Sequence, residues 1–130
     1  MLNEIYTYLA NKLSDYNVVE EYDDNNKNSC FIYISELSPN YEENEGGEEI
    51  LDYSISAEIL VKLTPLRVGK IKFREYVYNQ VENIVNLLNF KTVYITNKIL
   101  KIEIENLYIE PLNKNEINIF IILKIGGYNG

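Results

Sequence analysis

The chain has 130 residues, with 20 acidic and 12 basic side chains, no histidine, one cysteine and a formal net charge of −8. A chain of this length can bury one hydrophobic core, so we predict a single domain over residues 1–130. Histidine is the commonest general base and metal ligand, and its absence argues against most catalytic constellations. We therefore expect no enzyme activity, no cofactor and no metal site.

The N-terminal quarter is predicted as one helix followed by two strands. Apolar residues at steps of three and four from Leu2 to Leu13 predict an amphipathic helix. Val18 and Val19 predict a short extended segment, and residues 30–37 (CFIYISEL) are rich in β-branched and aromatic side chains. A polar turn joins these two strands.

Residues 38–49 (SPNYEENEGGEE) have the composition of a loop. They contain a proline, two adjacent glycines and five glutamates, with no aliphatic residue. We predict that this segment is a flexible acidic loop. Its carboxylates are suitable calcium ligands, but their spacing does not match an EF-hand, and no GK[ST] follows the glycines as a phosphate-binding loop would require.

The middle of the chain predicts one strand and one long helix. From Leu51 to Leu63 every odd position is apolar and most even positions are polar, which is the pattern of a half-buried strand. Apolar residues at helical spacing from Phe73 to Leu88 then predict a helix over about residues 69–89. Residues 93–95 predict a further short strand.

The C-terminal third predicts a long hairpin. In residues 100–110 the apolar positions change parity, which predicts a bulge near Asn106 or a strand buried on both faces. Residues 111–115 are predicted as the turn and residues 117–125 as the last strand, followed by a flexible tail at 126–130. The order α-β-β-β-α-(β)-β-β predicts an α+β fold, a mostly antiparallel β-sheet with two helices packed on one face.

Charge is distributed unevenly along the sequence. Residues 1–58 sum to −12 and residues 59–130 sum to +4. Two interpretations are open: both regions are solvated faces, or an acidic surface of one copy meets a basic surface of the next and closes a ring. The second interpretation gives these candidate contact residues: Glu42, Glu43, Glu45, Glu48, Glu49, Arg67, Lys70, Lys72 and Arg74.

Cys30 and the twelve tyrosines have simple structural interpretations. Cys30 lies beside a strand-forming run, so we expect a buried small side chain rather than a reactive thiol. Tyrosine stacks on nucleic-acid bases, but the strongly negative net charge argues against sequence-specific binding of DNA or RNA. We expect the tyrosines at the core edge and in interfaces.

A lone cysteine cannot form an internal disulfide, and the N-terminus lacks the basic segment and long apolar run of a signal peptide. No apolar run approaches the length that spans a membrane. We expect synthesis in the bacterial cytoplasm and no membrane partner.

The order of elements resembles the tail terminator proteins of tailed bacteriophages and phage-tail-like particles. The resemblance depends on the N-terminal helix, the acidic insertion, the strand LDYSISAEILVKL, the helix FREYVYNQVENIVNLL and the hairpin KIEIENLYIEPLNKNEINIFIILKI. It implies a hexameric ring that caps the head-proximal end of the tail tube, ends its polymerisation and joins it to the head. The implied partners are the tail tube protein, the tail sheath and the head-tail connector, with DNA passing through the ring and no cofactor.

Two alternatives remain open at this stage. The chain is also compatible with a head-tail connector or tail completion protein, which has a similar pattern of elements. A small acidic module that binds or regulates a basic protein partner is the alternative from another class. If the chain is a tail terminator or a connector, an edge strand at residues 18–19 or 117–125 is available to pair with a neighbouring copy.

Overall fold

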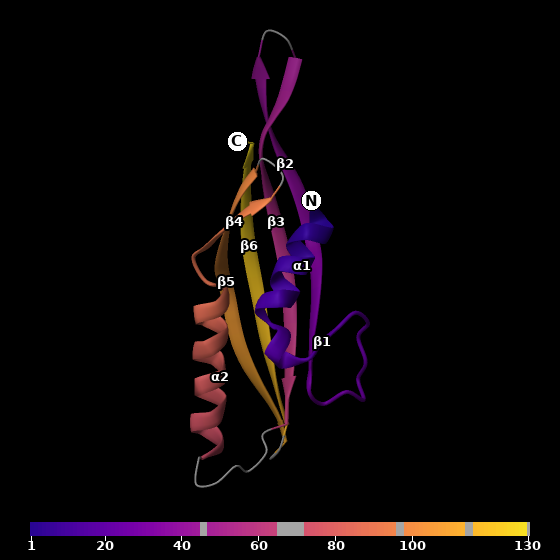
Figure 1. Cartoon of the computed structure of the whole chain (residues 1–130), viewed down its shortest axis with the longest axis vertical. Coiled ribbons are helices and arrows are strands. Elements are labelled where there is room, and N and C mark those ends of the chain that lie inside the picture. Colours follow the sequence, from indigo (N-terminus) through magenta and orange to yellow (C-terminus); the bar gives the residue numbers. More distant parts are fainter. Residues whose placement is uncertain (45–46, 65–71, 96–97, 114–115, 130) are drawn as a thin grey trace.

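The computed structural model describes residues 1–44, 47–64, 72–95, 98–113 and 116–129, of which residues 40–44, 47–52 and 127–129 are described by their backbone alone. It has two α-helices, one 3₁₀ helix and six strands (Figure 1). In chain order the elements are α1 (Leu2–Lys12), η1 (Ser14–Tyr16), β1 (Val18–Val19), β2 (Ser29–Asn44), β3 (Gly47–Leu63), α2 (Phe73–Leu88), β4 (Lys91–Ile95), β5 (Lys98–Asn113) and β6 (Glu116–Asn129).

The six strands form one sheet in the order β1-β2-β3-β6-β5-β4. The prediction of an α+β fold is confirmed, but the sheet is mixed rather than mostly antiparallel. Val18 pairs with Cys30 in a parallel ladder. The two strands run in the same direction because the segment between them brings the chain back to the level at which β1 begins. The predicted order of elements is matched in part, since the structure adds η1 between α1 and β1.

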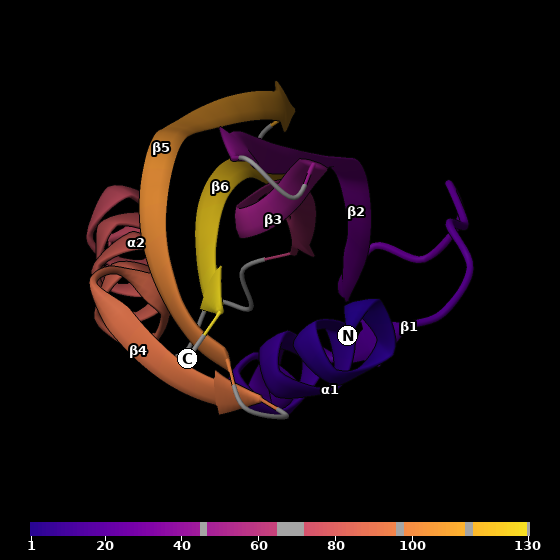
Figure 2. The ribbon, with the colours of Figure 1, turned by 90° about the horizontal axis from the view of Figure 1, so that it is seen from above.

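Both helices contribute to one hydrophobic core on one face of the sheet. α1 buries Ile5 and Leu9, and α2 buries Val77, Ile84 and Leu88. The odd positions of β3 and β6 are buried in the same cluster, as the alternation of apolar residues predicts. Seen from above, the sheet is strongly curved, with α1 and α2 beside it (Figure 2).

The predicted bulge in the fifth strand is confirmed. The register between β5 and β6 shifts between Ile104 and Asn106, so one residue of β5 has no counterpart on β6. Leu100 and Ile102 are buried before the shift, and Leu107 and Ile109 pack against the same core after it. The extra residue therefore keeps apolar side chains of opposite parity on one face.

The prediction of a loop at residues 38–49 is wrong for the described part of this segment. β2 continues to Asn44 and β3 begins at Gly47, with Glu42 opposite Glu49 and Glu43 opposite Glu48. Composition misled the prediction because strand formation depends on pairing context more than on propensity. Pro39 is tolerated because this part of β2 is at the edge of the sheet and needs no N–H donor there.

The predicted turn at 111–115 and tail at 126–130 are also shorter in the structure. β5 extends to Asn113 and β6 to Asn129, while residues 114–115 and 130 are outside the described part. Gly126 pairs with Ser54 on one side and Lys101 on the other, so the glycines continue the ladder. α2 begins at Phe73, later than the predicted residue 69.

Candidate functional site

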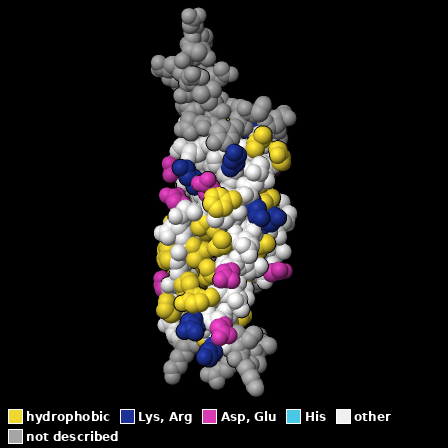
Figure 3. Space-filling view, turned by 90° about the vertical axis from the view of Figure 1, so that its left-hand side faces the viewer, with side chains coloured by type: hydrophobic (Ala, Val, Ile, Leu, Met, Phe, Trp, Pro, Cys, Tyr) yellow, Lys and Arg dark blue, Asp and Glu magenta, His cyan; other side chains and the backbone are white. Residues whose placement is uncertain are grey.

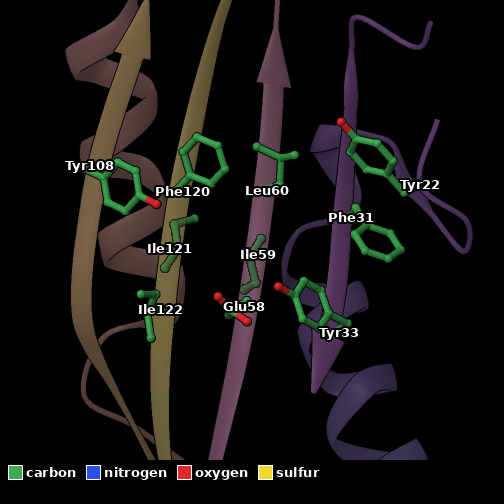
Figure 4. A pocket seen from close by; sticks show the side chains of 10 residues that line it. All are labelled: Tyr22, Phe31, Tyr33, Glu58, Ile59, Leu60, Tyr108, Phe120, Ile121 and Ile122. Atoms are coloured by element: carbon green, nitrogen blue, oxygen red, sulfur yellow. The ribbon is translucent and has the colours of Figure 1, made fainter. Parts of the chain in front are cut away.

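The face of the sheet opposite the helices carries a cluster of aromatic and aliphatic side chains (Figure 4). Phe31 and Tyr33 come from β2, Leu60 from β3, Phe120 and Ile122 from β6, and Tyr108 from β5. They surround a hollow of about 310 Å³. We call this surface, together with Tyr22, the aromatic face.

Ring contacts order the two sides of the aromatic face. Tyr108 stacks on Phe120 with the ring centroids 4.9 Å apart, and Phe31 lies 5.6 Å from Tyr33 and 5.9 Å from Tyr22. Tyr33 lies opposite Glu58 in the β2–β3 ladder, and the nearby Glu58 carboxylate raises the pKa of the Tyr33 hydroxyl. The arrangement is an aromatic and aliphatic surface with the carboxylate of Glu58 among its side chains.

The β5 bulge explains why Tyr108 belongs to this surface. Before the shift, even-numbered residues of β5 such as Ile102 are buried in the core. After the shift, the even-numbered Tyr108 pairs with Phe120 and lies with it on the aromatic face. The sequence signal for this face was present in the apolar even positions Leu60, Phe120 and Ile122. It was missed because the remaining even positions of these strands are mostly polar.

Residues 20–28 are attached to the sheet by charged and aromatic contacts. Lys27 Nζ lies 2.8 Å from Glu116 Oε1, and this ion pair lowers the pKa of the Glu116 carboxyl. Lys62 Nζ lies 4.6 Å from the centre of the Tyr22 ring and donates to the backbone carbonyl of Asp23 at 3.2 Å. These contacts hold Tyr22 beside Phe31 and complete that side of the aromatic face.

A smaller hollow of about 160 Å³ lies beside these contacts. Its lining includes Lys27, Lys62, Glu116 and Asn118, and Asn118 Oδ1 is buried without a hydrogen-bond partner among the described residues. Apolar residues, Leu63, Leu112 and Ile117, also line the hollow, which is large enough to admit water.

The predicted acidic contact residues lie on a two-stranded arm. From Tyr41 to Asn44 and from Gly47 to Ile50, β2 and β3 pair only with each other in the described structure, because β6 meets β3 no further than Asp52. Figure 1 shows these strand ends projecting past the sheet. We call the ribbon of residues 41–44 and 47–50 the acidic arm; it holds Glu42, Glu43, Glu48 and Glu49, and Glu45 lies outside the described residues.

The predicted basic residues are placed far from the acidic arm. Lys72 is the N-cap of α2 and Arg74 is in its first turn, and both are exposed, while Arg67 and Lys70 lie outside the described residues. The start of α2 is at the end of the molecule opposite the arm (Figure 1). The fold therefore separates the two charged groups within one copy rather than bringing them together.

Cys30 is a core residue, as predicted. Its side chain is completely buried, and desolvation raises the pKa of the thiol to about 12. The described residues contain no group of three or more cysteine, aspartate or glutamate side chains arranged to hold a metal ion. What these surfaces offer chemically is apolar contact and charge.

Exposed hydrophobic side chains also occur away from the aromatic face. On the side of the molecule that lies to the left in Figure 1, they form a band along the long axis with charged side chains around it (Figure 3). Phe90 and Tyr94, next to and within β4, are each 78% exposed. None of the helices in the described part of the chain has the length and apolar character needed to cross a membrane.

The predicted pairing edges are corrected by the sheet order. Residues 117–125 belong to β6, which is flanked by β3 and β5 and has no free edge there. β1 is at an edge of the sheet, but it has only two residues and offers few backbone groups for pairing with another strand. The longer free edges are on β2 and β5. These strands contain Pro39 and Pro111, and the ladder that each forms with its inner neighbour has two register shifts, which are features that discourage edge pairing.

Comparison with known proteins shows a shared fold. The structure is similar to a chain from the virion of a native gene transfer agent particle, with a TM-score of 0.51 and 9% sequence identity. The alignment covers 95% of this chain and 91% of that chain, so the likeness includes nearly the whole of both. No protein-family model and no curated protein matches the sequence.

Proposed function

We propose that this chain is a structural subunit of a phage-like particle, without enzyme activity or a cofactor. The observation that supports this most is the fold shared with a gene transfer agent virion chain over 95% of the present chain. The candidate surfaces also favour assembly over catalysis, since they consist of aromatic contacts and charge.

More narrowly, we propose a tail-terminator-like role. Copies form a hexameric ring that caps the head-proximal end of the tail tube, ends its polymerisation and joins it to the head. The partners are the tail tube protein and, in this proposal, the tail sheath and head-tail connector, with DNA passing through the ring. The net charge of −8 favours this arrangement, because an acidic channel lets DNA pass without binding it.

The proposed contact residues lie at the two ends of the molecule. The glutamates of the acidic arm are at one end, and Lys72 and Arg74 at the start of α2 are at the other (Figure 1). In a ring of side-by-side copies whose axis follows the long axis, the two ends remain on opposite sides of the ring. The end formed by the start of α2 is then available to a partner on one side of the ring.

The test is the mass and negative-stain image of the purified protein, alone and mixed with preassembled tail tube of the same particle. We expect six-fold rings, free or seated on one end of each tube, that dissociate as salt rises because screening weakens contacts between exposed charges. A variant with Glu75→Gln and Glu82→Gln is the control for a change in net charge. It removes two exposed acidic side chains from α2 and leaves the arm unchanged, so it should form the same rings as the wild type.

A protein that remains monomeric and ignores the tube at every concentration contradicts the terminator role. Binding to a portal or connector in place of the tube supports a head-tail connector or tail completion protein. Binding to neither, with capture of a basic protein, supports the acidic binding module.

A further inference from the structure

The β4 edge of the sheet carries exposed aromatic and basic side chains that the core does not use. Phe90 and Tyr94 are each 78% exposed. A shallow hollow of about 300 Å³ is lined by Phe90, Lys91, Thr92, Lys101, Ile102 and Glu103. We call Phe90, Lys91, Thr92, Tyr94 and Lys101 the β4 patch. An exposed cluster with two large aromatic rings is typical of a contact surface.

The backbone at Phe90 adds to this observation. Phe90 has φ of 56°, in the left-handed region, directly after the C-cap of α2. Glycine is the ordinary residue at such a position after a helix, and a bulky side chain there is unfavourable. A phenylalanine that is both unfavourable in backbone conformation and 78% exposed gains little from burial in the single copy, which favours a role in binding.

The β4 patch contains two lysines, and one exposed carboxylate, that of Glu103, lines the same hollow. Between Glu82 and Glu103 the sequence contains no acidic residue and has three lysines, at positions 91, 98 and 101. Lys98 is engaged within the copy, with its Nζ 4.2 Å from the centre of the Tyr53 ring. Neither Lys91 nor Lys101 forms an ion pair with a residue whose side chain the structure describes, so both charges are available to a partner.

The acidic arm has the opposite charge. Its sequence contains Glu42, Glu43, Glu48 and Glu49, and the backbone register pairs position 42 with 49 and position 43 with 48. The two strands of the arm have no other strand beside them in the described structure. A basic surface outside its own copy would complement the charge of this ribbon.

The fold places these two features at opposite edges of one sheet, with the patch below the base of the arm: Lys101 pairs with Gly126, and Gly126 pairs with Ser54. The arm continues β2 and β3, whereas β4 is the last strand at the other edge. Lys98, at the start of β5, pairs with Asn129, and the adjacent Tyr128 pairs with Asp52 at the base of the arm. Two complementary surfaces on opposite sides of a subunit make a head-to-tail contact that closes into a ring if the rotation permits.

We propose that the β4 patch of one copy receives the acidic arm of the next copy. This inference depends on the proposed function, because it names the contact that closes the ring. It differs from the pairing predicted from sequence, in which the arm meets the start of α2, since that region is at the opposite end of the molecule (Figure 1).

The experiment uses two full-length variants with reversed charge. The patch variant carries Lys91→Glu and Lys101→Glu, and the arm variant carries Glu43→Lys and Glu48→Lys. We expect each variant alone to need about tenfold or more protein to form rings than the wild type, while an equal mixture assembles as the wild type does. In that mixture every contact joins opposite charges, so native mass spectrometry should find the two variants in equal numbers in each ring.

The matched control carries Glu82→Lys and Glu110→Lys, which change the net charge as much as the arm variant does, at exposed positions outside the arm, the patch and the start of α2. This variant should fold normally and form rings as the wild type does. Circular dichroism and thermal unfolding check the fold of all variants. A further variant, Phe90→Gly, should weaken assembly while preserving the fold.

The outcomes separate this inference from the proposed function. If the wild type forms rings and the patch variant does so equally well, the β4 contact is wrong and the ring remains. If the patch variant fails and the mixture does not recover, the arm is not its partner and the inference is overturned. A wild type that forms no ring with or without the tube overturns both proposals.

Discussion

At the scale of single residues, Cys30 shows how burial determines chemistry. The thiol is completely buried between β1 and β3, and its pKa is raised to about 12 by desolvation alone. The nucleophilic form of cysteine is the thiolate, which is therefore scarce near neutral pH. The residue acts in the fold as a small apolar side chain.

We expect Cys30 in the native protein to resist thiol reagents at pH 8 and to react fully once the chain is unfolded. The rate of modification by a chromogenic disulfide reagent, with and without urea, measures this. Cys30→Ser should lower the free energy of unfolding by about 1–3 kcal/mol, because it buries a hydroxyl without an assured partner. Rapid modification of the folded protein would contradict the assignment.

Phe90 leads to a second prediction at the same scale. The left-handed backbone costs a residue with a Cβ about 1–2 kcal/mol, whereas glycine adds about 0.5–1 kcal/mol of entropy to the unfolded chain. These effects oppose each other, so Phe90→Gly should change the free energy of unfolding by less than about 1 kcal/mol. Urea unfolding tests this, and a large loss of stability would show that the Phe90 ring supports the fold of the single copy.

At the scale of elements, β5 is the strand whose register matters most. The shift between Ile104 and Asn106 places Leu107 and Ile109 on the core side and Tyr108 beside Phe120. Without the extra residue, simple alternation would turn these side chains to the opposite faces. One residue thus determines the composition of both surfaces of the sheet near this end.

Deletion of Glu105 should destabilise the protein by about 2–4 kcal/mol, because it removes the buried contacts of two aliphatic side chains. The substitution Glu105→Gln keeps the residue count and serves as the control, with little change expected. Equilibrium unfolding in urea gives both values. Equal midpoints for the deletion and the control would mean that β5 tolerates either register.

At the scale of the whole molecule, the acidic and basic halves of the sequence meet in two ion pairs. Lys27, before β2, lies against Glu116 at the start of β6, and Lys62 of β3 lies 3.8 Å from Asp24. These contacts join segments that are distant in the chain. They are partly exposed, so solvent and salt weaken them.

The Lys27–Glu116 pair predicts a pH dependence with a definite sign. The pKa of Glu116 is lowered from 4.5 in the folded state, so the pair stabilises the fold above that pH and loses its effect as the pH falls through the lowered value. Glu116→Gln should therefore unfold at lower urea than the wild type above pH 5, with the difference disappearing in more acidic solution. Glu110→Gln, at the same end of the hairpin, is the control. If the difference in urea midpoint between Glu116→Gln and the wild type persists in acid, the Lys27–Glu116 ion pair is not its cause.

The sequence by itself determined the elements whose burial pattern is local. Alternation from Leu51 to Leu63 and helical spacing from Phe73 to Leu88 predict a strand and a helix that the structure contains, because each periodicity reports which side of that segment faces the core. The parity change near Asn106 predicted the bulge for the same reason.

Only the tertiary structure decided the features that depend on pairing between distant segments. The acidic arm has the composition of a loop and becomes a ribbon because two strands continue to pair beyond the sheet. The parallel β1–β2 contact, the aromatic face and the β4 patch likewise require knowing which strands are neighbours. Composition and periodicity report how one segment meets solvent and core, whereas register between segments determines which side chains gather into a surface.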